Sequence, residues 1–151
     1  MRDRVVRVLL VLMAVSSGFV GSWALLAPRS FYDDFPGGGR HWVSADGPYN
    51  EHLVRDVGGL NLALTVVVVV AAIALVRVLV RTAAVATLVF GIPHFAYHAA
   101  HTDLYETSDS VATLFSLGLA IVLPIVVLVV VSRPEDGQLR QERTSERVAL
   151  E

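Results

Sequence analysis

Three histidines near residue 100 have a spacing that allows chemistry on one face of a helix. His94, His98 and His101 follow one another at intervals of four and three residues. At about 100° per residue, the three lie within about 60° on one helical face, over about two turns. Neutral imidazoles at this spacing ligate Zn, Cu or Fe, and imidazoles also transfer protons. The spacing predicts a metal site or a proton-handling site.

A second helix must complete such a metal site, because three imidazoles in one row do not all reach one ion. Glu51, His52 and Asp56 stand near the start of another apolar stretch, and His52 and Asp56 are again four residues apart. The chain contains no Cys, so thiolate ligands are excluded. The predicted ligands of a divalent metal ion are therefore His94, His98, His101, His52, Glu51 and Asp56.

Other interpretations of these histidines stay open. Haem b could be held axially by two histidines at matching depth on facing helices. His94 has no such counterpart on the other apolar stretches, whereas His52 could match His98 or His101 near the surface, and haem is less favoured than a small ion. Histidines at a membrane boundary also form structural hydrogen bonds with backbone, headgroups or tyrosines. Arg55, Tyr97 and Asn61 are expected to contact a substrate or a lipid headgroup, although Arg55 is also placed to pair with Glu51.

The elements that must position these side chains are four apolar stretches. Each contains 20 to 23 residues without Asp, Glu, Lys or Arg: residues 8–28, 57–76, 82–102 and 110–132. A helix of about 20 apolar residues crosses the ~30 Å hydrocarbon layer of a lipid bilayer. The composition, 54% hydrophobic and 17% charged, excludes a soluble enzyme and a nucleic-acid-binding protein. We predict an all-α, four-helix transmembrane bundle over residues 1–132, with helices at residues 5–27, 50–80, 82–101 and 110–132.

The connection between the first two predicted helices, residues 28–50, is rich in aromatic residues. It is predicted to be an outer loop with a turn at residues 36–39. Its rings either fold over the mouth of the bundle or lie in the headgroup zone as an interfacial belt. Residues 133–151 are predicted to form a disordered cytoplasmic tail, and its closing Leu150 and Glu151 resemble a cloning remnant.

The placement of arginine predicts the orientation in the membrane. Nine of the twelve Arg residues lie before the first stretch, between the second and third, or after the fourth. Because cytoplasmic segments collect positive charge, both termini are predicted to be cytoplasmic. All five His then lie on the outer side of a bacterial inner (plasma) membrane. An alternative takes the first stretch as a signal peptide cleaved near Ser22-Trp23-Ala24, but this stretch exceeds the usual apolar core of such peptides.

Four short-looped apolar helices with a polar outer loop, over about 130 of the 151 residues, resemble small four-helix bacterial membrane proteins of the DoxX-like type. The resemblance is one of architecture. It implies an association with quinone or sulfur redox complexes. The histidines at residues 94–101 are not part of it.

Three functions follow from these features. The first is a divalent metal ion bound in a pocket of histidines and carboxylates at the outer face. The second is a non-catalytic subunit or assembly factor that packs against a membrane protein partner or a second copy of itself. The third is a metal-free lipid- or quinone-handling enzyme in which His98 and Asp56 act as acid and base. The sequence leaves open whether the protein is an enzyme.

Overall fold

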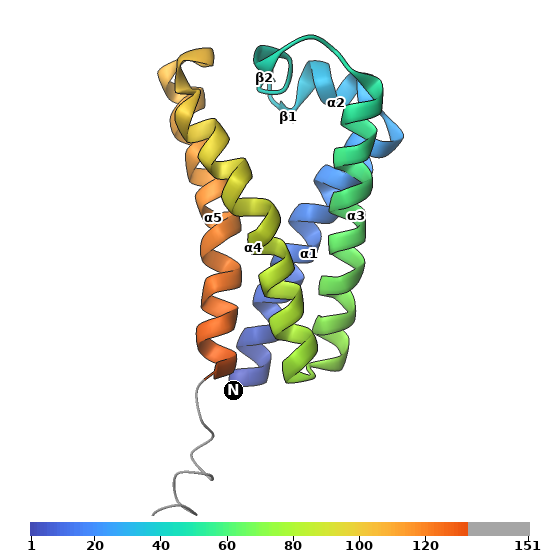
Figure 1. Cartoon of the computed structure of the whole chain (residues 1–151), viewed down its shortest axis with the longest axis vertical. Coiled ribbons are helices and arrows are strands. Elements are labelled where there is room, and N and C mark those ends of the chain that lie inside the picture. Colours follow the sequence, from blue (N-terminus) through green and yellow to red (C-terminus); the bar gives the residue numbers. More distant parts are fainter. Residues whose placement is uncertain (133–151) are drawn as a thin grey trace, which may run out of the picture.

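The computed structural model describes residues 1–132, and the predicted tail at residues 133–151 lies outside this range. Four long helices form the bundle in Figure 1: α1 (Arg2–Leu26), α3 (Glu51–Ala74), α4 (Arg77–Ala100) and α5 (Thr107–Ser132). A helix of 24 residues, such as α3, is about 36 Å long, which exceeds the ~30 Å hydrocarbon layer. All four are long and apolar enough to cross a membrane. The chain is an all-α integral membrane protein with four candidate spans.

The two ends of the bundle differ (Figure 1). One end, called here the loop end, carries the short elements α2 (Pro28–Asp34), β1 (Pro36–Gly37), β2 (Arg40–His41), η1 (Ser44–Asp46) and η2 (Thr102–Leu104). The other, called the arginine end, carries the start of α1, the α3–α4 turn and the end of α5. The predicted loop thus begins as a helix, because the fixed φ of Pro28 suits a first helical position.

The turn between α3 and α4 lies earlier in the chain than the sequence predicted. The prediction placed helices at residues 50–80 and 82–101, whereas α3 ends at Ala74 and α4 begins at Arg77. Leu75 takes the left-handed conformation at φ 51°, which ends the helix, and Val76 is extended. Nothing in this apolar run signals a turn, so the break could not be located from residue types. Asn50 caps the start of α3, since its side chain accepts a hydrogen bond from the Leu53 amide at 3.1 Å.

Helices α1 and α3 cross in close contact at two glycines. A Cβ on Gly58 would lie 2.5 Å from the backbone nitrogen of Leu25, and a Cβ on Gly21 would lie 2.9 Å from that of Leu62. Small residues allow this approach in lipid, where dispersion contacts and hydrogen bonds hold helices together. The two helices therefore form a tightly packed pair.

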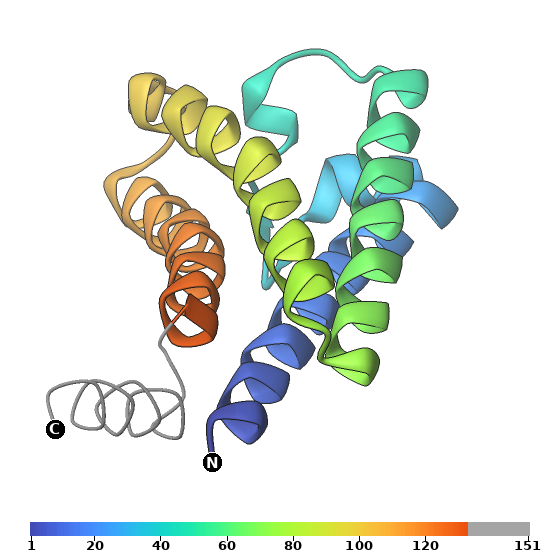
Figure 2. The same ribbon diagram turned by 60° about the horizontal axis from the view of Figure 1, so that its bottom comes forward.

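Two apolar clusters form the core. At the arginine end, the larger cluster joins all four long helices through residues such as Leu10, Val68, Val80 and Val127. At the loop end, Ala24, Phe31 and Val54 form a smaller cluster that joins α1, α2 and α3. The ribbons of α3 and α4 diverge from their shared turn toward the loop end in both views (Figures 1 and 2). The long helices are thus packed together at one end and separated into pairs at the other.

The substitution Gly58→Ala is expected to destabilise the protein by about 1–3 kcal/mol, because the added methyl group meets backbone that must move. The matched control is Gly59→Ala. Nothing lies within 4 Å of the position of its Cβ, so the change should be neutral or stabilising by up to ~1 kcal/mol. Reversible unfolding in mixed detergent micelles measures both values. Equal free energies of unfolding for the two variants would contradict the close α1–α3 crossing.

Candidate functional site

The residues predicted on α3 interact among themselves. Arg55 Nε donates to Glu51 Oε1 at 2.8 Å, and His52 Nε2 lies 3.4 Å from Asp56 Oδ2. Arg55 also donates to the Leu25 carbonyl at the end of α1. The interpretation in which Arg55 pairs with Glu51 is thus confirmed. All four α3 side chains are well exposed, His52 to 88%.

The α4 histidines have other neighbours. The ring centroids of His94 and His98 are 4.8 Å apart and the rings meet edge to face. His98 Nδ1 lies 3.3 Å from the Tyr105 hydroxyl. His101 Nδ1 lies 2.8 Å from the Tyr97 carbonyl, and its ring stacks on the Tyr97 ring at 4.2 Å between centroids. The structure therefore brings His94 and His98 together, and it places His101 against the backbone of its own helix.

The predicted metal ligands are not assembled into one group. Within residues 1–132, no three His, Asp or Glu side chains are grouped so that they could hold a metal ion. The loop-end halves of α3 and α4 lie apart (Figures 1 and 2), because the glycine crossing holds α3 against α1. The predicted six-residue centre has no support from the structure, and metal binding stays a prediction.

Residues of the α1–α3 connection, rather than residues of α3, reach the α4–α5 region. Tyr97 donates its hydroxyl proton to Asp46 Oδ1 at 3.0 Å, and the Tyr105 hydroxyl donates to the Trp42 carbonyl at 3.2 Å. Arg40 Nη1 donates to Asp109 Oδ1 at 2.7 Å. We call these three hydrogen bonds the loop contacts. The connection therefore folds across the bundle toward α4 and α5, as one of the two interpretations of its aromatic residues required.

The hydrogen bonds of Tyr105 determine the tautomer of His98. Since the Tyr105 hydroxyl donates its proton to the Trp42 carbonyl, it accepts one from His98 Nδ1. The proton of neutral His98 is thereby assigned to Nδ1, and Nε2 keeps its lone pair. Burial, and then the negative charge of Asp46 and the neighbouring Tyr97, raise the pKa of Tyr105 to about 12. The phenol therefore stays protonated at neutral pH and holds this arrangement.

Polar groups of this region without a partner among the described residues include the buried Thr113 hydroxyl on α5, the His94 ring and the Trp42 indole. His94 is half-buried within α4 and stacks on Phe90 with 5.4 Å between ring centroids; in residues 1–132 its ring nitrogens make no hydrogen bond. The indole Nε1 of Trp42 is buried and is likewise without an acceptor in this part of the chain. Buried polar groups usually find a partner, so the His94 ring and the Trp42 indole are both suited to hydrogen-bond a ligand.

Several residues of the site were not predicted from the sequence. Asn61, which was predicted to contact a ligand, instead bonds within its own helix. Asp46 and Trp42 belong to the α1–α3 connection and Asp109 to the first turn of α5, and no periodic pattern reveals their partners or those of Tyr105. Asn61 is buried at 6% exposure, and its side-chain amide donates to the Val57 carbonyl of its own helix at 2.9 Å.

Comparison with protein-family models, with curated proteins and with solved structures finds no match for this chain. The four apolar helices support a small four-span membrane protein, and no family match supports the predicted resemblance to the DoxX-like type. The function must therefore be argued from the geometry of the site.

The substitution Asp46→Asn is expected to lower the pKa of Tyr105 from about 12, because a negative charge nearby disfavours the phenolate. The pKa should fall only part of the way to the ordinary value for tyrosine, since burial is the larger cause of the shift and is unchanged. The measurement is a titration of the phenolate ultraviolet absorbance, with Tyr105→Phe identifying the signal. Asp33→Asn on α2 is the control, because Asp33 pairs with Arg29. A Tyr105 titration unchanged by Asp46→Asn would show that Asp46 does not lie beside α4.

Proposed function

We propose that the loop end of α4 binds the neutral, carbonyl-bearing head of a membrane-borne molecule of the quinone class. The observation that carries this proposal is His94, a half-buried imidazole in a candidate span without a hydrogen-bond partner among the described residues. Ionisable side chains within membrane spans are costly, and they commonly mark ligand or proton pathways. A neutral imidazole can donate to a carbonyl oxygen without placing a charge in the bilayer.

Two further features fit the same ligand. The Trp42 indole, on the connection whose carbonyl bonds Tyr105, is a second N–H donor without an acceptor in residues 1–132, and a quinone head has two carbonyl acceptors. The Phe90 and His94 rings are nearly parallel, with 18° between their planes, and a flat head can stack against such rings in the offset manner of aromatic groups. The proposal uses donors and rings that the fold leaves available.

The charges at this end favour a neutral head over an anionic one. Arg40 is paired with Asp109, and Arg55 is paired with Glu51. Asp46 adds a negative charge beside Tyr97. A phosphate would therefore meet a carboxylate and two neutralised guanidinium groups, whereas a carbonyl head needs only hydrogen-bond donors.

Tyr105, His98 and His94 form a row in which hydrogen bonds and a proton can be exchanged with such a head. Within residues 1–132, His98 Nε2 makes no hydrogen bond and can accept a proton while Nδ1 bonds the Tyr105 hydroxyl. The acid–base pair predicted from the sequence, His98 with Asp56, needs revision. Asp56 lies beside His52 on α3, so Asp46 is the carboxylate that we assign to this region.

A divalent metal ion on His94 and His98 is the second candidate, favoured by the 4.8 Å between their ring centroids. Two imidazoles would leave the remaining coordination positions to water or to a ligand.

We also propose that the arginine end faces the cytoplasm of a bacterial cell, because Arg2, Arg4, Arg7, Arg77 and Arg81 gather there.

Binding of decylubiquinone to the protein in nanodiscs tests the proposal, with quenching of tryptophan fluorescence as the signal. His94→Phe is expected to weaken binding about three- to tenfold, the range expected when one hydrogen bond is lost. His52→Phe is the matched control. It makes the same chemical change on an 88% exposed side chain of α3, and it should leave the affinity unchanged.

Elemental analysis of the same preparations separates the two candidates. Zinc, copper or iron that is retained by the wild type and the His52→Phe variant, and lost from the His94→Phe variant, would favour the metal site. Equal quinone affinity in both variants would contradict the proposed function. Absence of both quinone and metal from the wild type would instead favour a non-catalytic subunit that acts through a protein partner.

A further inference from the structure

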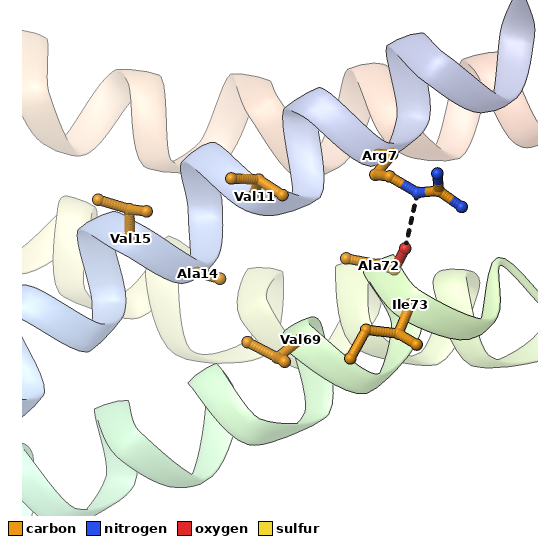
Figure 3. A pocket seen from close by; sticks show the side chains of 7 residues that line it. All are labelled: Arg7, Val11, Ala14, Val15, Val69, Ala72 and Ile73. Carbon is orange, nitrogen blue, oxygen red and sulfur yellow. Dashed lines mark hydrogen bonds between the residues drawn. The ribbon is translucent and has the colours of Figure 1, made fainter.

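A groove of about 550 Å³ lies between α1 and α3 in the half of the bundle nearest the arginine end. Its lining is one cation, Arg7, together with six apolar residues: Val11, Ala14, Val15, Val69, Ala72 and Ile73 (Figure 3). The groove lies at the opposite end from His94, and nothing proposed above occupies it.

Arg7 is held at one end of this groove, and most of its donors are unused among the residues that the structure describes. Its Nε donates to the Ala72 carbonyl at 3.2 Å (Figure 3). This carbonyl belongs to the last turn of α3, where backbone acceptors lack amide partners and a cation is favoured. No carboxylate pairs with Arg7 within residues 1–132, and Asp3, one turn earlier, lies 3.9 Å from Arg2 instead. The terminal guanidinium nitrogens are therefore available to an anion.

The rest of the groove fits a hydrocarbon chain. The rim residues Val15 and Ile73 are 65% and 74% exposed, so the groove opens toward the surrounding lipid. From Arg7 to Val15 the groove follows eight residues of α1, or about 12 Å, close to the ~15 Å depth of one leaflet. Water would find no hydrogen-bond partner along the valine-lined part. A lipid chain, by contrast, fills it with dispersion contacts.

We propose that this groove binds one anionic phospholipid, with an acyl chain along the apolar floor and the phosphate on Arg7. Guanidinium groups bind phosphate through paired, charge-assisted hydrogen bonds. Arg77, at the start of α4 and at the same end of the bundle, adds to the positive potential that attracts an anionic headgroup. Arg7 thus has two roles, since it caps the end of α3 and selects the charge of the lipid.

Native mass spectrometry tests this proposal on protein reconstituted in nanodiscs of equal parts phosphatidylglycerol and phosphatidylcholine. Wild-type protein is expected to retain phosphatidylglycerol in preference. Arg7→Gln should reduce that preference about fivefold, the effect expected of one cation at a membrane surface. Arg4→Gln is the matched control, because it removes an exposed cation one turn away that does not line the groove. That variant should keep most of the preference.

A second variant separates the chain from the headgroup. Val15→Trp places a bulky ring on the exposed rim, so it should reduce retention of both lipids while leaving Arg7 in place. Three results would overturn the proposal: a preference that Arg7→Gln and Arg4→Gln reduce equally, retention unaffected by Val15→Trp, or a dimer that carries no lipid and is disrupted by Val15→Trp. The last result would assign the groove to a second copy of the chain.

Discussion

The loop contacts connect two pairs of helices at the end where their apolar packing has ended. At the arginine end all four long helices share one cluster, but the smaller cluster at the loop end includes only α1, α2 and α3. The bonds from Tyr97 to Asp46, from Tyr105 to Trp42 and from Arg40 to Asp109 reach across to α4 and α5. Hydrogen bonds of this kind gain strength where water is scarce. They also bring the Asp46 carboxylate to Tyr97 and the Trp42 carbonyl to Tyr105, the two tyrosines that contact the α4 histidines.

The two ends of the molecule consequently suit different ligands. At the loop end each arginine near the site is paired with a carboxylate, and the unused groups are neutral donors and acceptors. At the arginine end, Arg7 bonds within residues 1–132 to a backbone carbonyl alone, and it lies beside an apolar groove. The loop end, where carboxylates neutralise the guanidinium groups, therefore suits a neutral head. The arginine end suits an anionic head.

Much of the architecture could be predicted from the sequence. Each helix that spans a bilayer requires an apolar stretch of about 20 residues, and the chain has four such stretches without charge. Local pairs such as Arg55 with Glu51 were also predictable, since helical spacing determines them. The separation of α3 from α4 at the loop end could not be predicted from the sequence. A short turn does place these helices side by side at Leu75, but the close contact of Gly21 and Gly58 holds α3 on α1 and separates it from α4 farther along. The partners of Asp46 and Trp42 depend on how an irregular connection folds, which no periodicity encodes.

Cross-linking of paired cysteines reports directly which segment lies beside the α4 histidines, and the natural chain has no Cys to interfere. One double variant carries Asp46→Cys with Tyr97→Cys, and the other carries Glu51→Cys with His98→Cys. The Tyr97 side chain holds the two Cβ atoms of the first pair too far apart for a direct disulfide, so a short bis-maleimide cross-linker is used. In native membranes it should join the cysteines of the first variant and leave those of the second unjoined. A cross-link in the second variant alone would place α3 at the histidines, and it would contradict the arrangement described for the loop end.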